Sequence, residues 1–141
     1  MERFLVDQML LRLGRWLRLL GMDVANPENA SDSELLRKSI KEKRVLVTRD
    51  KRLVDACRSL QGECILIRAS RLEEQLREMA QRGVPLALNP QRCTLCNSAL
   101  QKVDSAKKAT WRCEGCKKIY WEGSHWINME KMLEKIRSSK N

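Results

Sequence analysis

Four carboxylates stand where expected strands end or expected helices begin. Asp7 directly follows the apolar run RFLV, and Asp50 follows the run RVLVT. Asp32 and Glu34 lie in SDSELL, at the start of an expected helix. Carboxylates that converge repel one another unless a cation compensates, and oxygen ligands favour Mg²⁺ or Mn²⁺. Such a cation can generate hydroxide and neutralise charge on a phosphodiester in the transition state.

Helix capping explains some of these acids equally well. Asp50 is placed to cap a helix that begins at Lys51. Ser31 and Glu34 have the spacing of a capping box. Asp55 is expected on the surface of the helix that follows Asp50, where it can be simply solvated.

Two cysteine pairs have the spacing of a zinc site. CTLC supplies Cys93 and Cys96, and CEGC supplies Cys113 and Cys116 after sixteen intervening residues. Two such turns present four thiolates to one ion, which predicts a structural, four-coordinate zinc site in a small ribbon. A redox pair is the alternative, but redox pairs usually stand alone at a helix start.

The chain is basic, with a net charge of +10 over 141 residues. Residues 91–141 carry 11 Lys/Arg against 5 Asp/Glu, whereas residues 1–90 carry 17 against 13. This balance favours a polyanion such as RNA, or less often an anionic membrane surface. The candidate RNA-binding cations of the ribbon are Lys107, Lys108, Arg112, Lys117 and Lys118, which lie among Trp111, Tyr120, Trp121 and Trp126. Rings between cations suit stacked bases, although they can also pack the ribbon against the main domain.

The elements expected to position these residues alternate between strand and helix. Strands are predicted at 3–6, 22–26, 44–48 and 64–68, and helices at 8–20, 31–43, 51–60 and 70–82. Ser70 and Glu73 are predicted to cap the last of these helices. The alternation predicts an α/β fold with a parallel sheet, whose strands all end at one edge. Asp7 and Asp50 are therefore expected at the same edge, with the start of the 31–43 helix nearby.

This pattern predicts that the chain is divided into three segments. Residues 1–90 form the α/β unit, to which VPLAL at 84–88 can add a strand. Residues 91–126 form the ribbon, and residues 127–141 form an amphipathic helix and tail. No apolar stretch approaches the roughly 20 residues that span a bilayer. We expect a cytoplasmic protein in a reducing compartment, with Cys57 and Cys64 as inert core thiols.

The ordered motifs FLVDQMLLRLGRWLRLLGMDV, SDSELL, RVLVTRDKRL and a four-cysteine ribbon leading into YWEGSHW resemble a known family. It is the PIN-like ribonuclease family with an appended zinc ribbon, the domain found at the C-terminus of Mut-seven exonucleases. The resemblance covers roughly residues 4–129 and implies a three-layer α/β/α PIN-type fold with a metal-dependent ribonuclease site. It implies Asp7, Asp32 and Asp50 as the Mg²⁺ or Mn²⁺ ligands, with Glu34 as the alternative middle acid and Asp55 as a weak fourth.

The first helix carries arginines at every third residue, Arg12, Arg15 and Arg18, which match recurrent arginines of that family. All three are candidate RNA-binding residues, and near Asp7, Arg12 and Arg15 are placed to hold a phosphate close to the metal. A solvated basic stripe, or pairing with the acids, is the alternative. His125, the single histidine, is expected to be structural.

These patterns leave three functions open. The first is a metal-dependent ribonuclease whose basic zinc ribbon helps to bind RNA. The second is an RNA- or ribosome-associated binding protein on a PIN-like scaffold, because Lys51 and Arg52 stand where some relatives place a fourth acid. The third is an adaptor that docks a protein partner through its C-terminal helix.

Overall fold

The larger sheet is parallel and has four strands in the order β2-β1-β3-β4. The computed structural model describes residues 2–103 and 109–138. The strands are β1 (Arg3–Val6), β2 (Asp23–Ala25), β3 (Val45–Thr48) and β4 (Cys64–Leu66). All four strands that the sequence predicts are present, and the last three are one or two residues shorter than expected.

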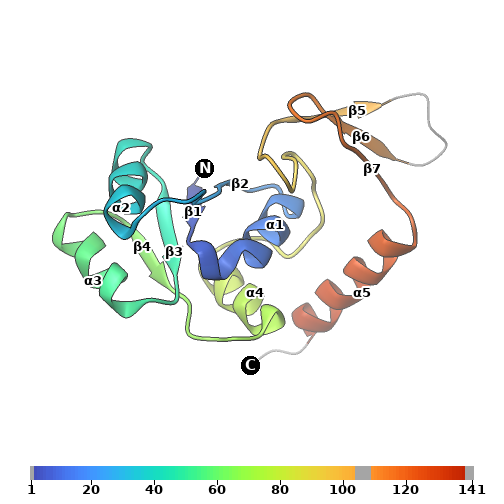
Figure 1. Cartoon of the computed structure of the whole chain (residues 1–141). Coiled ribbons are helices and arrows are strands. Elements are labelled where there is room, and N and C mark those ends of the chain that lie inside the picture. The colour runs from blue at the N-terminus through green and yellow to red at the C-terminus, as the bar shows by residue number, and fades with distance from the viewer. Residues whose placement is uncertain (1, 104–108, 139–141) are drawn as a thin grey trace.

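Helices cover both faces of this sheet (Figure 1). A 3₁₀ turn (Gln8–Leu10) leads into α1 (Leu11–Leu19), and the other helices are α2 (Asp32–Lys41), α3 (Lys51–Ser59), α4 (Leu72–Gln81) and α5 (Ser124–Ser138). Strand side chains alternate between the faces, so Phe4 and Val6 join the larger core with α1 and α4. Leu5 joins the smaller core with α2 and α3. The three-layer α/β/α architecture predicted from the sequence is confirmed.

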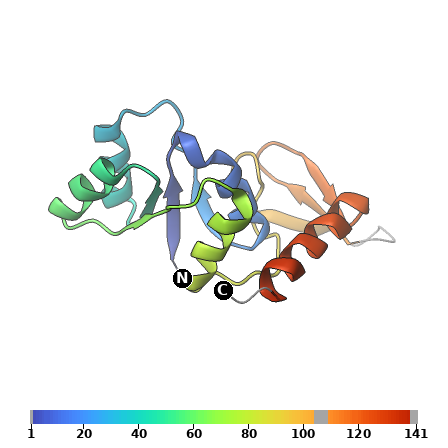
Figure 2. The ribbon, with the colours of Figure 1, turned by 90° about the horizontal axis from the view of Figure 1, so that it is seen from below.

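The C-terminal helix packs back onto the α/β unit. Leu133 and Ile136 of α5 are buried in the larger core, and α5 lies beside α4 (Figure 2). The helix begins at Ser124 rather than at residue 127. Its apolar side is therefore occupied by the chain itself, which weakens the expectation that a protein partner docks there.

Two predicted details of the element ends are correct and two are wrong. Gly21 ends α1 with φ of +94°, a conformation that favours glycine. Ser31 and Glu34 form the predicted capping box of α2.

Ser70 does not cap α4, which begins after Arg71 with no side-chain cap. The carboxylate of Glu78 accepts from the backbone N–H groups of Arg68 and Ala69, in the loop before this helix, at 3.0 and 2.9 Å. The VPLAL segment is an irregular connection and not a strand.

The ribbon is a separate antiparallel sheet of β5 (Leu100–Val103), β6 (Thr110–Cys113) and β7 (Ile119–Trp121). It lies between the α/β unit and the start of α5 (Figure 1). Two of the predicted RNA-binding residues, Lys107 and Lys108, lie outside the described residues. Across the described ranges, every helix is too short or too polar to cross a lipid bilayer.

Candidate metal centres and nucleic-acid interface

The four predicted zinc ligands meet at one point. The Sγ atoms of Cys93 and Cys116 are 3.6 Å apart, those of Cys96 and Cys113 are 3.4 Å apart, and all four lie within 4.8 Å of one another. Tetrahedral zinc with Zn–S bonds of about 2.3 Å separates its sulfurs by about 3.8 Å. A disulfide needs an S–S distance of about 2.05 Å, so the arrangement fits a zinc ion and not two disulfides.

Tight turns after each cysteine pair make this convergence possible. Asn97 and Lys117 directly follow the two pairs and have left-handed backbones, with φ of 64° and 66°. Gly115 lets the two turns approach closely, because a Cβ at this position would lie 2.5 Å from Oγ of Ser98. A hydrogen bond from Ser98 lowers the pKa of the Cys96 thiol to about 6, which favours the thiolate that zinc binds.

Tyr120 supports the cluster from the side of the ribbon. Its hydroxyl lies 3.0 Å from Sγ of Cys93 and 2.9 Å from Oγ1 of Thr94. Burial raises the pKa of the Tyr120 hydroxyl to about 12, so the group keeps its proton at neutral pH. The hydroxyl of Tyr120 thus supports the cysteine cluster and is not available to a ligand.

The other two cysteines pack in or against the smaller core, as the sequence predicts. Cys57 is fully buried, and burial raises the pKa of its thiol to about 11. Cys64 is half-buried beside it and packs against the smaller core. Neither belongs to the metal cluster.

Asp7 lies at the carboxyl edge, by which we mean the C-terminal ends of the four parallel strands. Its side chain is only 7% exposed. One carboxylate oxygen accepts from the backbone N–H of Met9 at 3.0 Å, and the other accepts from the hydroxyl of Thr48. The same Thr48 oxygen accepts from the backbone N–H of Asp50 at 3.0 Å. Thr48 therefore links the carboxylate of Asp7 to the backbone N–H of Asp50.

The other candidate acids are exposed at the surface, unlike Asp7. Asp50 is exposed and caps α3, accepting from the backbone N–H of Arg52 at 2.9 Å, so the capping role is present. Asp32 is exposed in the first turn of α2, and Glu34 is held by Ser31. Asp55 is exposed on α3. Among the described residues, only the four cysteines bring three or more Cys, His, Asp or Glu ligand atoms within 4.8 Å of one another.

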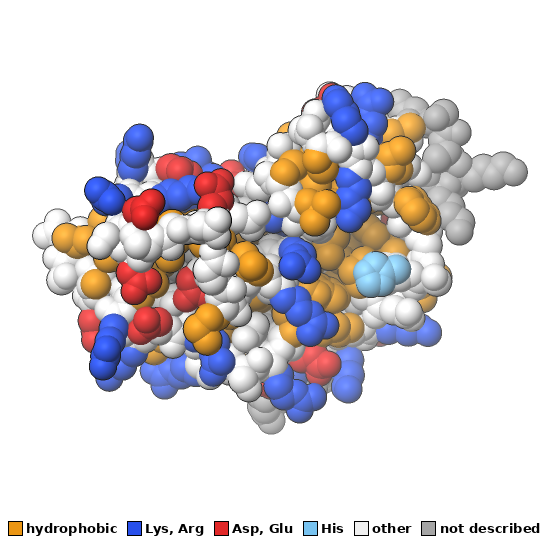
Figure 3. Space-filling view, in the orientation of Figure 1, with side chains coloured by type: hydrophobic (Ala, Val, Ile, Leu, Met, Phe, Trp, Pro, Cys, Tyr) orange, Lys and Arg blue, Asp and Glu red, His pale blue; other side chains and the backbone are white. Residues whose placement is uncertain are grey.

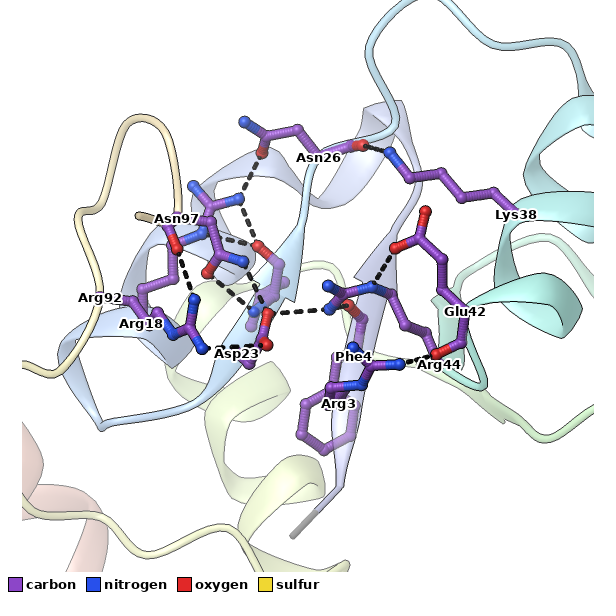
Figure 4. A network of polar contacts seen from close by, with 11 residues as sticks. Arg3, Phe4, Arg18, Asp23, Asn26, Lys38, Glu42, Arg44, Arg92 and Asn97 are labelled. Carbon is purple, nitrogen blue, oxygen red and sulfur yellow. Dashed lines mark hydrogen bonds and ion pairs between the residues drawn. The ribbon is translucent and has the colours of Figure 1, made fainter. Parts of the chain in front are cut away.

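Arg18 is not at a phosphate site, contrary to its grouping with Arg12 and Arg15 in the sequence. It is 1% exposed and lies between β2 and the first cysteine turn (Figure 4). Its guanidinium donates to the carbonyl of Val24 at 2.8 and 2.5 Å, to the carbonyl of Thr94 at 2.6 Å and to the side chain of Asn26 at 2.8 Å. Burial lowers the pKa of this guanidinium, although its full set of acceptors compensates for the lost water.

Asp23 and Asn97 continue the same contact. The amide of Asn97 donates to Asp23 at 2.6 Å, and its oxygen accepts from the backbone N–H of Val24 at 3.0 Å. Arg44 and Arg92 form ion pairs with Asp23 at 2.9 and 3.4 Å (Figure 4). The Arg18–Asp23 network, which comprises Arg18, Asp23, Asn26, Arg44, Arg92 and Asn97, ties the ribbon to the sheet.

A sequence model described as the Mut7-C RNAse domain matches residues 2–133, which is nearly the whole chain. The chain belongs to the Mut7-C RNAse domain family. The match includes both the acidic edge and the four cysteines of the ribbon. No curated protein and no solved structure gives a significant match to the chain.

The remaining predicted RNA-binding residues of this Mut7-C domain are all exposed. Arg12 and Arg15 lie on one face of α1. Arg112 and Lys117 pair with Glu114 at 3.4 and 3.9 Å. The ammonium of Lys118 lies 5.0 Å from the ring centre of Tyr120.

The tryptophans of the Mut7-C ribbon divide into packing residues and free residues. Trp111 on β6 stacks on Trp126 of α5, with ring centres 5.3 Å apart and planes at 12°. This pair fastens the helix to the ribbon, as the packing alternative predicts. Trp121 is 60% exposed. His125 is exposed at the start of α5.

Sequence reasoning missed the Arg18–Asp23 network of this Mut7-C domain, since it joins residues within 18–44 to residues within 92–97. The network also predicts how the stability of the fold depends on pH. Burial disfavours the charged form of Asp23, but the bonds from Asn97 and Arg44 outweigh this, and the pKa of Asp23 lies below its ordinary value. A lowered carboxyl pKa stabilises the fold above the unfolded value of about 4, and the contribution is lost as the pH falls below it.

We therefore expect Asp23→Asn to lower the free energy of unfolding by about 2 kcal/mol at pH 7, because hydrogen bonds to a charged group are lost. The difference from wild type should shrink as the pH falls below about 4 and through the lowered pKa of Asp23 in the folded protein. Urea unfolding across this range, with zinc content followed in parallel, tests the prediction. A difference that stays constant with pH would assign the effect to packing rather than to charge.

Proposed function

We propose that the protein is a metal-dependent ribonuclease that hydrolyses RNA phosphodiesters at the carboxyl edge. The observation that carries the proposal is the buried carboxylate of Asp7, held by Thr48 directly beside Asp50. Burying a carboxylate is costly without compensation, and a cation at this edge supplies it. The family match supports an RNA-related, nuclease-like function in this chain.

In this proposal Asp7, Asp32 and Asp50 hold Mg²⁺ or Mn²⁺, on a scaffold of the PIN-like type. Mg²⁺ or Mn²⁺ held there would supply a Lewis acid for the attacking water and for the charge on the phosphate. Only one oxygen of Asp50 serves the helix cap, so the capping role and a ligand role are compatible. Glu34 and Asp55 are secondary members of the site.

Thr48 and the 3₁₀ turn keep Asp7 in place. The hydroxyl of Thr48 and the backbone N–H of Met9 donate to different oxygens of Asp7, which fixes the plane of the carboxylate. Metal ligands commonly depend on such outer hydrogen bonds for orientation. Arg12 and Arg15, on the helix that starts at this turn, are placed to bind the phosphates of the substrate.

The ribbon contributes binding and not chemistry. Its zinc is structural, because all four positions are filled by cysteines. We propose that Arg112, Lys117 and Lys118, together with Lys107 and Lys108, add phosphate contacts for RNA, with ribosomal or structured RNA among the candidates. A cytoplasmic location belongs to the same proposal.

The test is cleavage of labelled RNA with added Mn²⁺ by wild type, Asp50→Asn and Glu134→Gln. Asn is as good a helix cap as Asp, so the melting temperature should hardly change. Cleavage by Asp50→Asn should fall at least about 100-fold, because a ligand charge is lost. The exposed Glu134 on α5 should be replaceable without effect. Wild-type cleavage by Asp50→Asn would leave Asp50 as a cap alone.

A second function has one specific observation in its favour. Lys51 and Arg52 directly follow Asp50, and both side chains are exposed. They place positive charge where a second cation would otherwise bind, which suits an RNA-binding protein with a weak or silent site. RNA binding by wild type without Mn²⁺-dependent cleavage would decide for this function.

A further inference from the structure

A groove lies between α1, β7 and the start of α5. Its volume is about 560 Å³, which falls within the range of pockets for small organic ligands. The cations that line it are Arg12, Arg15, Arg92 and Lys118, and the rings are Trp16, Tyr120, Trp121, His125 and Trp126. Figure 3 shows Lys and Arg side chains in the hollow between the α/β unit and the ribbon. We call it the ribbon groove.

The ribbon groove is strongly cationic. None of the described residues that line it is acidic. Within the described ranges, Arg12, Arg15 and Lys118 take part in no salt bridge. Arg12 and Arg15 are neighbours on one helix face, where like charges repel each other. An anion between them would relieve this repulsion, and a phosphate accepts from two arginines at once.

Trp121 is the exposed tryptophan among the rings of the ribbon groove. Trp126 already stacks on Trp111, and the hydroxyl of Tyr120 is engaged at Cys93. Trp121 is 60% exposed, which leaves a large apolar surface in water. Gly123 gives its indole room, because a Cβ there would lie 3.0 Å from Nε1 of Trp121.

We infer that the ribbon groove binds unpaired nucleotides of single-stranded RNA, with a base stacked on Trp121 and phosphates on Arg12 and Arg15. This inference rests on the proposed function in taking RNA as the ligand. Exposed rings beside cations bind single strands, since the bases of a duplex are already stacked and paired. Arg12 lies five residues after Asp7, and the face from Arg12 to Leu19 extends about 10 Å along α1. The α1 wall of the groove thus begins five residues after the proposed catalytic acid Asp7.

The experiment measures binding of a fluorescein-labelled eight-nucleotide oligouridylate by anisotropy, in the Asp7→Asn background so that cleavage does not interfere. Trp121→Ala should weaken binding about 10-fold, since stacking on one base contributes about 1–3 kcal/mol. Trp121→Phe should keep most of the affinity. Ile127→Ala removes a 55% exposed apolar side chain of α5 outside the groove and should have no effect. Zinc content and melting temperature verify that each variant is folded.

Arg12→Gln with Arg15→Gln should reduce the slope of log Kd against log salt by about 1.4, because two phosphate contacts are lost and each contributes about 0.7 on a single strand. Lys131→Glu, on the exposed side of α5, serves as the charge control. Unchanged affinity of Trp121→Ala overturns the inference, and so does equal binding of an RNA duplex. If polyglutamate at equal concentration displaced the RNA, the inference would also be overturned, and an acidic protein would be the indicated ligand of the groove. Trp121-dependent binding without cleavage by wild type would support the groove and contradict the proposed nuclease.

Discussion

Asp7→Asn should abolish RNA cleavage while leaving the protein folded. The amide oxygen of the new side chain can still accept from the N–H of Met9, but the charge that we propose holds the cation is lost. We expect the Mn²⁺-dependent rate to fall by about two to four orders of magnitude, because the cation supplies the nucleophile. Mn²⁺ should raise the melting temperature of wild type and not of the variant, since a ligand that binds only the native state stabilises it.

Thr48→Val provides a graded comparison. Valine keeps the shape of threonine but removes the hydroxyl that donates to Asp7 and accepts from Asp50. Loss of such an outer contact typically costs about 10–100-fold in metal affinity or activity. Cleavage should therefore fall less than in Asp7→Asn. Full activity in Asp7→Asn would contradict a metal site at the carboxyl edge, whatever the result for Thr48.

Cys113→Ser should remove the zinc and destabilise the whole chain. Without the ion, the turn that carries Thr94 and Asn97 loses its anchor, and these residues no longer fix Arg18 and Asp23. Breaking a buried charged contact costs about 3–5 kcal/mol, or about 10 °C or more in melting temperature for a chain of this size. We therefore expect the effect to reach the α/β unit, and not to stop at the ribbon.

The measurement combines zinc content, melting temperature and hydrogen exchange of β2 and α1. Wild type should hold one zinc per chain and Cys113→Ser none. Cys64→Ser is the matched control, because this half-buried thiol lies outside the cluster and its replacement should leave the zinc in place. Unchanged exchange in β2 after loss of zinc would show that the sheet does not depend on the ribbon.

Local pattern predicted the parallel sheet and the cysteine cluster because both are encoded over short distances. RVLVT is a short apolar run that ends before Asp50, and each CxxC turn brings its own two sulfurs together. The placement of Asp7 beside Asp50 also followed, since parallel strands share a carboxyl edge. The sequence did not predict that Thr48 links Asp7 and Asp50, because a hydroxyl in an apolar strand does not indicate its hydrogen-bond partners.

Long-range polar contacts account for what the sequence could not predict. The spacing of Arg12, Arg15 and Arg18 suggested one role, yet the third side chain turns inward to backbone carbonyls of residues 24 and 94. Glu78 of α4 accepts from the backbone N–H groups of Arg68 and Ala69, next to the serine that was expected to cap the helix. In each case the decisive partner is a backbone group that composition and periodicity do not report.

The contact between Val24 and the ribbon also has a consequence for solubility. Strand β2 is paired on one side only, by β1. On its open side, the N–H of Val24 is occupied by Asn97 and its carbonyl by Arg18. An outer strand with free backbone groups is a template for pairing with another chain. By holding Asn97 in place, the zinc ribbon shields this strand, so depletion of the metal should turn a protected sheet edge into an aggregation site.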